Sequence, residues 1–151
     1  MKLPVAKANA FAERPDKSFR LYLVYGPDSG MVRENALKLL KAFVPDLSDP
    51  FSVSAVEAST IAKDPSRLFD EMASQSLLGG RRVLHVQDAG DEIFPMVDRL
   101  LKELPPGESV AVVEAGALEK RSKLRTRVEG EEGAAAWGLV QHGRPPLLQI
   151  T

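Results

Sequence analysis

The chain of 151 residues contains no cysteine. This absence excludes a disulfide framework and any thiolate metal site, and it is compatible with a reducing cytoplasm. The sequence also lacks any stretch close to the roughly 20 apolar residues that span a bilayer. No uninterrupted apolar run follows residues 1–7, so a signal peptide is not expected. We therefore expect a cytoplasmic protein without a membrane partner.

An excess of charge of one sign is missing too. Twenty Lys and Arg residues stand against 21 Asp and Glu residues, which leaves a formal net charge of -1. A balanced chain has no overall attraction to nucleic acid or to anionic lipid, so any such contact needs a local patch. The hydrophobic share of 44% and the length are ordinary for one globular domain with a sizeable core.

Short apolar runs alternate with segments of helical pattern along most of the chain. The expected strands are 21–25, 51–56, 82–86 and 110–113, and the expected helices are 29–44, 64–78, 91–104 and 117–128. This order predicts an α/β fold of three layers, in which helices cover both faces of a mostly parallel sheet.

The end of the sequence has a different character. Residues 134–140 could form a fifth strand, but Pro145 and Pro146 then interrupt any regular pattern. We expect an α/β domain over residues 1–133 and an atypical tail over residues 134–151, which could hold a last strand and a disordered end.

A glycine loop follows the first expected strand. A strand, a glycine loop and a helix N-terminus form the geometry that cradles phosphate on backbone N–H groups. The P-loop pattern G-x-x-x-x-G-K-[ST] places lysine on the phosphates and a hydroxyl on Mg²⁺. Counted from Gly26, the second glycine position holds Met31 and the lysine position holds Val32. The first segment thus has the outline of a P-loop without its working residues.

Nearby residues do not restore this loop. Ser29 and Gly30 have no lysine beside them, and Asp28 would repel a phosphate. Glu114, after the fourth strand, has the position of a Walker-type acid but no nucleotide to serve. We interpret Gly26, Ser29 and Gly30 as a degenerate loop that makes only a strand-to-helix turn, and we expect no cofactor.

Acid–base or metal chemistry has little support. His85 lies within a strand pattern and His142 in the tail, so a packed or an exposed histidine is the favoured interpretation of each. Asp88, Asp91 and Glu92 cluster after the third strand, where an α/β fold places its ligand crevice. Three carboxylates could bind a metal there, but their roles as turn and cap residues explain them better, and we expect no metal site.

One segment gathers positive charge. Its basic residues are Lys120, Arg121, Lys123, Arg125 and Arg127. On a helix these positions spread around most of the cylinder, and no aromatic residue is interleaved for base stacking. A solvated helix is the favoured interpretation, and contact with phosphate stays open.

Two leucines mark the end of the second expected helix. Leu77 and Leu78 precede Gly79-Gly80 and Arg81-Arg82. They could make the hydrophobic contact of a helix C-terminus that a glycine ends. They could also be apolar anchors at a rigid tip that fill a pocket on a partner. The pattern alone favours the first interpretation.

Three segments in order resemble one protein family. Residues 20–30, 75–83 and 112–125 are similar to the N-terminal domain of the delta subunit of bacterial DNA polymerase III, in its alphaproteobacterial style. The resemblance covers roughly residues 5 to 130. It implies an AAA+-like domain of P-loop NTPase ancestry that has lost ATP binding, acting as a non-catalytic subunit of the polymerase holoenzyme.

The resemblance also implies partners. The delta subunit belongs to the clamp loader: it binds the ring-shaped sliding clamp and opens it for loading onto primed DNA. The family's wedge element corresponds here to Ser76, Leu77 and Leu78, with Met72 and Gln75 as flanking contacts. Leu78 stands where phenylalanine is common, which keeps an apolar anchor but loses ring area.

Family members continue into lid and collar domains that join the other loader subunits, so this chain is expected to lack those contacts and to meet DNA only indirectly. Two other functions stay open. One is a divergent P-loop ATPase or phosphotransferase fragment that uses Gly26, Ser29 and Glu114. The other is a small regulatory domain of the flavodoxin or response-receiver kind.

Overall fold

A computed structural model describes residues 19–44, 53–64, 66, 70, 83–103 and 110–139. Ten elements lie in these ranges. In chain order they are β1 (Leu21–Tyr25), α2 (Ser29–Phe43), β2 (Val53–Glu57), α3 (Ala58–Lys63), β3 (Val83–Ala89), the 3-10 turn η2 (Asp91–Ile93), α5 (Phe94–Glu103), β4 (Val110–Ala115), α6 (Lys123–Glu129) and β5 (Ala134–Gly138).

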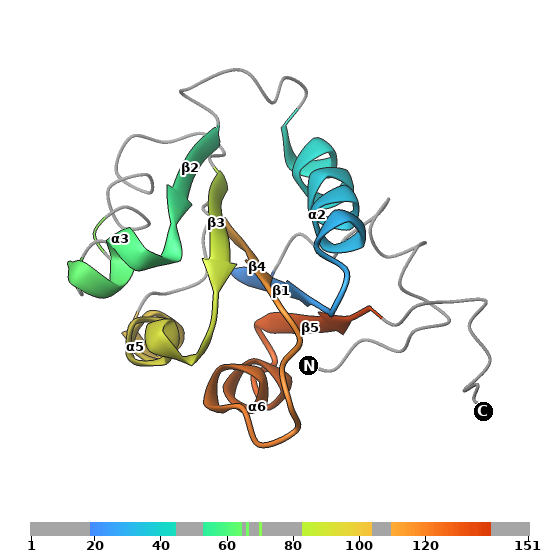
Figure 1. Cartoon of the computed structure of the whole chain (residues 1–151). Helices are drawn as coiled ribbons and strands as arrows, with labels where there is room; N and C mark the ends of the chain where they lie inside the picture. Colours follow the sequence, from blue (N-terminus) through green and yellow to red (C-terminus); the bar gives the residue numbers. More distant parts are fainter. Residues whose placement is uncertain are drawn as a thin grey trace, which may run out of the picture.

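The five strands form one sheet in the order β2-β3-β4-β1-β5, and every neighbouring pair is parallel. Helix α2 covers one face of the sheet, while α3, α5 and α6 cover the other (Figure 1). The predicted three-layer α/β fold is confirmed. None of the helices within the described ranges has the length and apolar character needed to span a bilayer.

The central strands are apolar on both sides because both of their faces are covered. All five residues of β1 and all six of β4 are buried. Leu21 and Leu23 pack against α5 and α6, whereas Tyr22 and Val24 pack against α2. This two-sided burial explains the continuous apolar runs, which differ from the alternation of a half-exposed strand.

Helix α2 begins and ends at signals that the sequence carries. The Asp28 side chain caps its first turn, and Val44, just before Pro45, already has an extended backbone. The residues that this helix buries recur with helical spacing and are Val32, Asn35, Ala36, Leu39, Leu40 and Phe43. Tertiary burial of this stripe fixes the helix against β1 and β4.

Several predicted boundaries were wrong. Strand β3 continues to Ala89, with a register shift between Val86 and Ala89 and a positive φ of 56° at Asp88. The short helix α3 follows β2 directly and had no counterpart in the predictions. Helix α6 begins at Lys123 instead of residue 117, because Ser122 caps it and residues 117–122 form a loop.

Strand β5 pairs with β1 along its whole length, from Leu21 opposite Ala134 to Tyr25 opposite Gly138. The sheet therefore extends beyond residue 133, the predicted end of the α/β domain, into the segment that was predicted as an atypical tail with a possible last strand. Most of the helix predicted over residues 64–78 lies outside the described residues.

Candidate functional site

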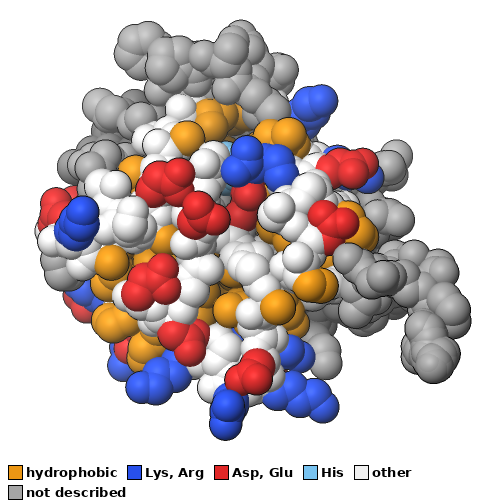
Figure 2. Space-filling model, in the orientation of Figure 1, with side chains coloured by type: hydrophobic (Ala, Val, Ile, Leu, Met, Phe, Trp, Pro, Cys, Tyr) orange, Lys and Arg blue, Asp and Glu red, His pale blue; other side chains and the backbone are white. Residues whose placement is uncertain are grey.

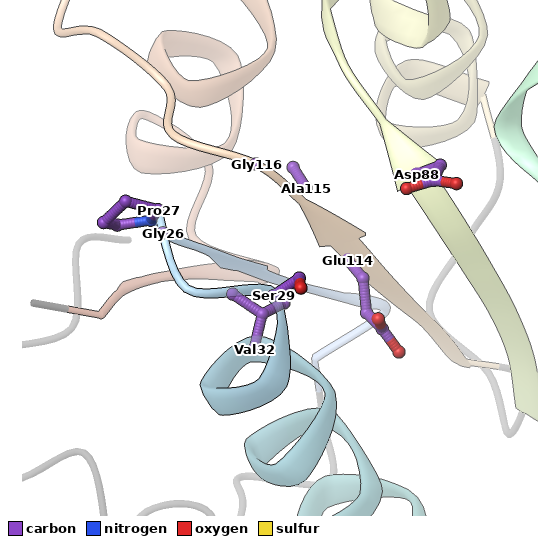
Figure 3. A pocket seen from close by; sticks show the side chains of 8 residues that line it. All are labelled: Gly26, Pro27, Ser29, Val32, Asp88, Glu114, Ala115 and Gly116. Carbon is purple, nitrogen blue, oxygen red and sulfur yellow. The ribbon is translucent and has the colours of Figure 1, made fainter. Parts of the chain in front are cut away.

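A cavity of about 100 Å³ lies at the carboxyl ends of the central strands. Strands β1 and β4 are neighbours whose following helices, α2 and α6, lie on opposite faces of the sheet. Such a switch point is where open α/β sheets bind their ligands. The cavity is lined by Gly26, Pro27, Ser29, Val32, Asp88, Glu114, Ala115 and Gly116. Figure 3 shows Glu114 and Asp88 reaching it from neighbouring strands, and Ser29 and Val32 from α2.

Gly26 is required by packing at this cavity. Its N–H donates to the carbonyl oxygen of Gly116 at 3.2 Å, and the N–H of Leu139 donates to the carbonyl oxygen of Tyr25 at 2.8 Å. A Cβ atom on Gly26 would lie only 2.7 Å from the Leu139 carbonyl oxygen. The backbone after β5 passes so close to position 26 that a side chain would not fit there. This packing explains the glycine, and no bound phosphate is needed to explain it.

The first turn of α2 has its amide groups occupied by its own cap. Asp28 Oδ1 accepts hydrogen bonds from the backbone N–H of Gly30 at 3.0 Å and of Met31 at 3.2 Å. These are the donors that a phosphate would use at a helix N-terminus. The loop therefore makes the turn that the sequence predicts, and its carboxylate stands where an anion would bind.

Glu114 is buried and has two partners. Arg33 Nε donates to both of its carboxylate oxygens, at 2.9 and 2.8 Å, and His85 Nε2 contacts Oε2. Burial raises the pKa of Glu114, but the hydrogen bonds and charges of His85 and Arg33 outweigh it and hold that pKa below its ordinary value. The carboxylate is thus ionised and neutralised within the chain. His85 is packed in the sheet, which is one of its two predicted interpretations.

The residues of the cavity do not fit a nucleoside triphosphate with its metal. Val32, at the lysine position, is buried and offers no charge. The cavity of about 100 Å³ is also well below the roughly 300 Å³ at which ligand pockets begin. Glu114, the candidate Walker-type acid, is committed to Arg33 and His85.

The three carboxylates that the sequence places after its third predicted strand are not brought together. Asp91 accepts a hydrogen bond from the Ser122 hydroxyl at 2.6 Å and one from the Leu124 N–H at 3.2 Å, so it caps α6 rather than its own helix. Asp88 instead lines the cavity. Within the described ranges, no group of three or more His, Cys, Asp or Glu residues could hold a metal ion.

The basic segment is divided between internal and exposed residues. Arg125 donates to Glu129, and its guanidinium carbon lies 5.2 Å from the centre of the Tyr25 ring. Arg127 donates to Asp98 and to Glu131, both at 2.8 Å. We call Arg125, Arg127 and these partners the α6 network.

The remaining basic residues of the segment, Lys120, Arg121 and Lys123, are exposed. Arg121 forms an open pair with Glu119 at 3.0 Å. Figure 2 shows acidic and basic side chains interspersed over the face that it presents. Two arginines of the segment therefore have partners within the domain, and the solvated interpretation holds for these three exposed residues.

The five residues predicted to bind the clamp, Met72, Gln75, Ser76, Leu77 and Leu78, lie outside the described residues. Their role stays a prediction. Sequence reasoning missed Arg33, although a signal was available: it follows Val32 and so takes the P-loop position that normally holds a hydroxyl.

The parallel sheet of order β2-β3-β4-β1-β5, with helices on both faces, defines a three-layer α/β fold. No known protein family and no curated protein matches the sequence. Solved structures do match. A DNA polymerase III gamma subunit-related protein of Thermotoga maritima is 14% identical, with a TM-score of 0.58 over 92% of this chain and 46% of that one.

The Bacillus subtilis DNA clamp loader delta protein is also 14% identical, with a TM-score of 0.61 over 91% of this chain and 43% of that protein. The DnaC helicase loader, 14% identical, has a TM-score of 0.50 over 89% of this chain and 87% of its own. This chain therefore spans less than half of the Thermotoga maritima and Bacillus subtilis proteins. The likeness shows a clamp-loader-like fold.

Proposed function

We propose that this chain is the clamp-binding domain of a delta-type clamp-loader subunit, which binds the sliding clamp and opens it for loading onto primed DNA. One observation carries the proposal: in a clamp-loader-like fold, the strand-end side chains of Arg33, His85 and Glu114 contact one another instead of fitting a nucleotide. A domain with this fold, whose described strand-end residues do not fit a nucleotide, is suited to binding other macromolecules.

In this proposal Leu77 and Leu78 are the apolar anchors, and Met72, Gln75 and Ser76 flank them. The anchors favour a strained, open form of the clamp, and they can shift that equilibrium only by their differential affinity for the two forms. In this proposal the domain meets DNA only indirectly. The domain has no catalysis of its own and works in the cytoplasm.

The alternatives are weaker. A divergent ATPase would need Gly26, Ser29 and Glu114 to face a nucleotide, whereas Glu114 is neutralised by Arg33 and His85. A flavodoxin or receiver domain has the strand order 2-1-3-4-5. The order here is β2-β3-β4-β1-β5, so the receiver alternative is wrong.

The test is binding of the whole chain to its cognate sliding clamp on a sensor surface, with and without ATP. Wild type should bind equally well in both conditions. The double variant Leu77→Ser, Leu78→Ser should lose at least about tenfold in affinity, since apolar anchors dominate such interfaces. Leu37→Ser is the matched control, because Leu37 is an exposed leucine on α2, 36% accessible, and should leave binding unchanged.

Circular dichroism keeps the outcomes distinct. Unchanged clamp affinity in a folded double variant would refute the anchor assignment. Loss of the fold in that variant would instead favour the interpretation of both leucines as core residues. Clamp binding that requires ATP would favour the ATPase alternative.

A further inference from the structure

The anion site of a P-loop has an internal occupant in this chain. In a P-loop the first turn of the helix binds phosphate through its free N–H groups. Here the N–H groups of Gly30 and Met31 donate to Asp28 Oδ1 at 3.0 and 3.2 Å. The Asp28 carboxylate carries the same sign of charge as a phosphate and is tethered at the same donors.

The cation site has an internal occupant as well. A P-loop NTPase holds Mg²⁺ between the hydroxyl that follows the lysine and an acid at a strand end. Counted from Gly26, Arg33 stands at the hydroxyl position. Its Nε lies 2.9 and 2.8 Å from the two oxygens of Glu114, at the end of β4. The guanidinium thus supplies positive charge to the strand-end acid.

We propose that Asp28 and Arg33 are built-in substitutes for phosphate and metal. The strand-end cavity has then not only lost the P-loop lysine: side chains of the chain itself occupy its anion and cation positions. The substitution is complementary: a fixed anion on the helix N-terminus and a fixed cation on Glu114. The domain then keeps one arrangement of α2 against β4 whether or not a nucleotide is present.

The consequence is a latent site that single substitutions should uncover. Removing the Arg33 charge leaves Glu114 with its contact to His85, while Asp88 lines the same cavity, and carboxylate oxygens suit Mn²⁺. Removing the Asp28 carboxylate frees two amide donors for an external anion. The inference deepens the non-catalytic part of the proposed function, and its readouts do not depend on clamp binding.

The experiment uses the whole chain as wild type, Arg33→Thr, Arg33→Lys and Asp28→Gly. Mn²⁺ binding is followed by electron paramagnetic resonance. Arg33→Thr should bind Mn²⁺ at least about tenfold more tightly than wild type, since an adjacent positive charge no longer repels the ion. Arg33→Lys, which keeps the charge, should behave like wild type.

Asp28→Gly is tested with pyrophosphate at millimolar concentration against sodium chloride of equal ionic strength. Pyrophosphate should raise its Tm by about 2 °C and leave that of wild type unchanged. Glycine is accepted at a helix N-cap, so this variant should fold even if Arg33→Thr does not.

Either of two results would overturn the inference. One is wild type that binds Mn²⁺ or pyrophosphate as well as the variants do. The other is a folded Arg33→Thr or Asp28→Gly variant that gains neither ligand. A wild type that fails to bind the clamp would sink the proposed function alone and leave these readouts interpretable.

Discussion

The strand-end cavity and the α6 network each gather arginines and carboxylates, but at different depths. At the cavity, Glu114 is nearly inaccessible, with 8% of its side chain exposed. In the network, Asp98 and Glu131 are about a quarter exposed. At the cavity, the Glu114 charge is buried and held by Arg33 and His85 next to the tightly packed backbone of Gly26, whereas the network charges are held by side-chain partners nearer to solvent. Their sensitivity to mutation should differ accordingly.

The largest effect should come from the backbone packing of the cavity. We expect Gly26→Ala to lower the free energy of unfolding by about 2 kcal/mol, because the new Cβ would lie 2.7 Å from the Leu139 carbonyl oxygen. Gly116→Ala is the matched control, since a Cβ there meets nothing within 4 Å. Urea denaturation followed by circular dichroism measures both. Equal stability of the two variants would contradict the packing argument.

A smaller effect is expected at the start of α6. Asp91→Ala removes the acceptor of the Ser122 hydroxyl and of the Leu124 N–H, and it should cost about 1 kcal/mol. Glu92→Ala, at the next and exposed position, should cost nothing measurable. Hydrogen exchange at the amides of Lys123 and Leu124 would locate the loss. Unchanged exchange at these amides would show that Asp91 does not hold the first turn of α6.

The smallest effect should be the acid response of the network. Hydrogen bonds from Arg127 hold the pKa values of Asp98 and Glu131 below their ordinary values. A carboxylate with a lowered pKa contributes stability that is present above its unfolded pKa and is lost as the pH falls through its folded pKa. The free energy of unfolding should therefore begin to fall below about pH 5. Glu131→Gln should flatten this dependence. A slope identical to that of wild type would mean that the pair with Arg127 contributes nothing.

The strands were predictable because strands that are buried on both faces have continuous apolar runs in their sequence, as in 21–25 and 110–113. The extension of β3 was not, because a positive φ at Asp88 and a register shift leave no apolar signal. Helix α3 is short, and Glu57 at its N-cap makes no side-chain hydrogen bond there, so no start signal exists.

The site was predictable only as an outline. The missing lysine at Val32 is visible in the sequence, but the partners of a charge are not. Arg33 contacts Glu114, and Asp91 contacts Ser122, although these partners are far apart in the sequence and meet only in the folded chain. Sequence could therefore show what the loop lacks and not what takes its place.

The parallel order of the sheet has a consequence for synthesis. Strand β1 is the second strand from one edge, yet both of its neighbours come from late segments, β4 at 110–115 and β5 at 134–138. As the chain leaves the ribosome, this wholly apolar strand must wait without a partner until those segments emerge. Such long-range pairing is slow, and an unpaired apolar strand is prone to aggregate. In a nascent chain, residues 21–25 should therefore stay without their sheet partners until residues 110–115 have been synthesised.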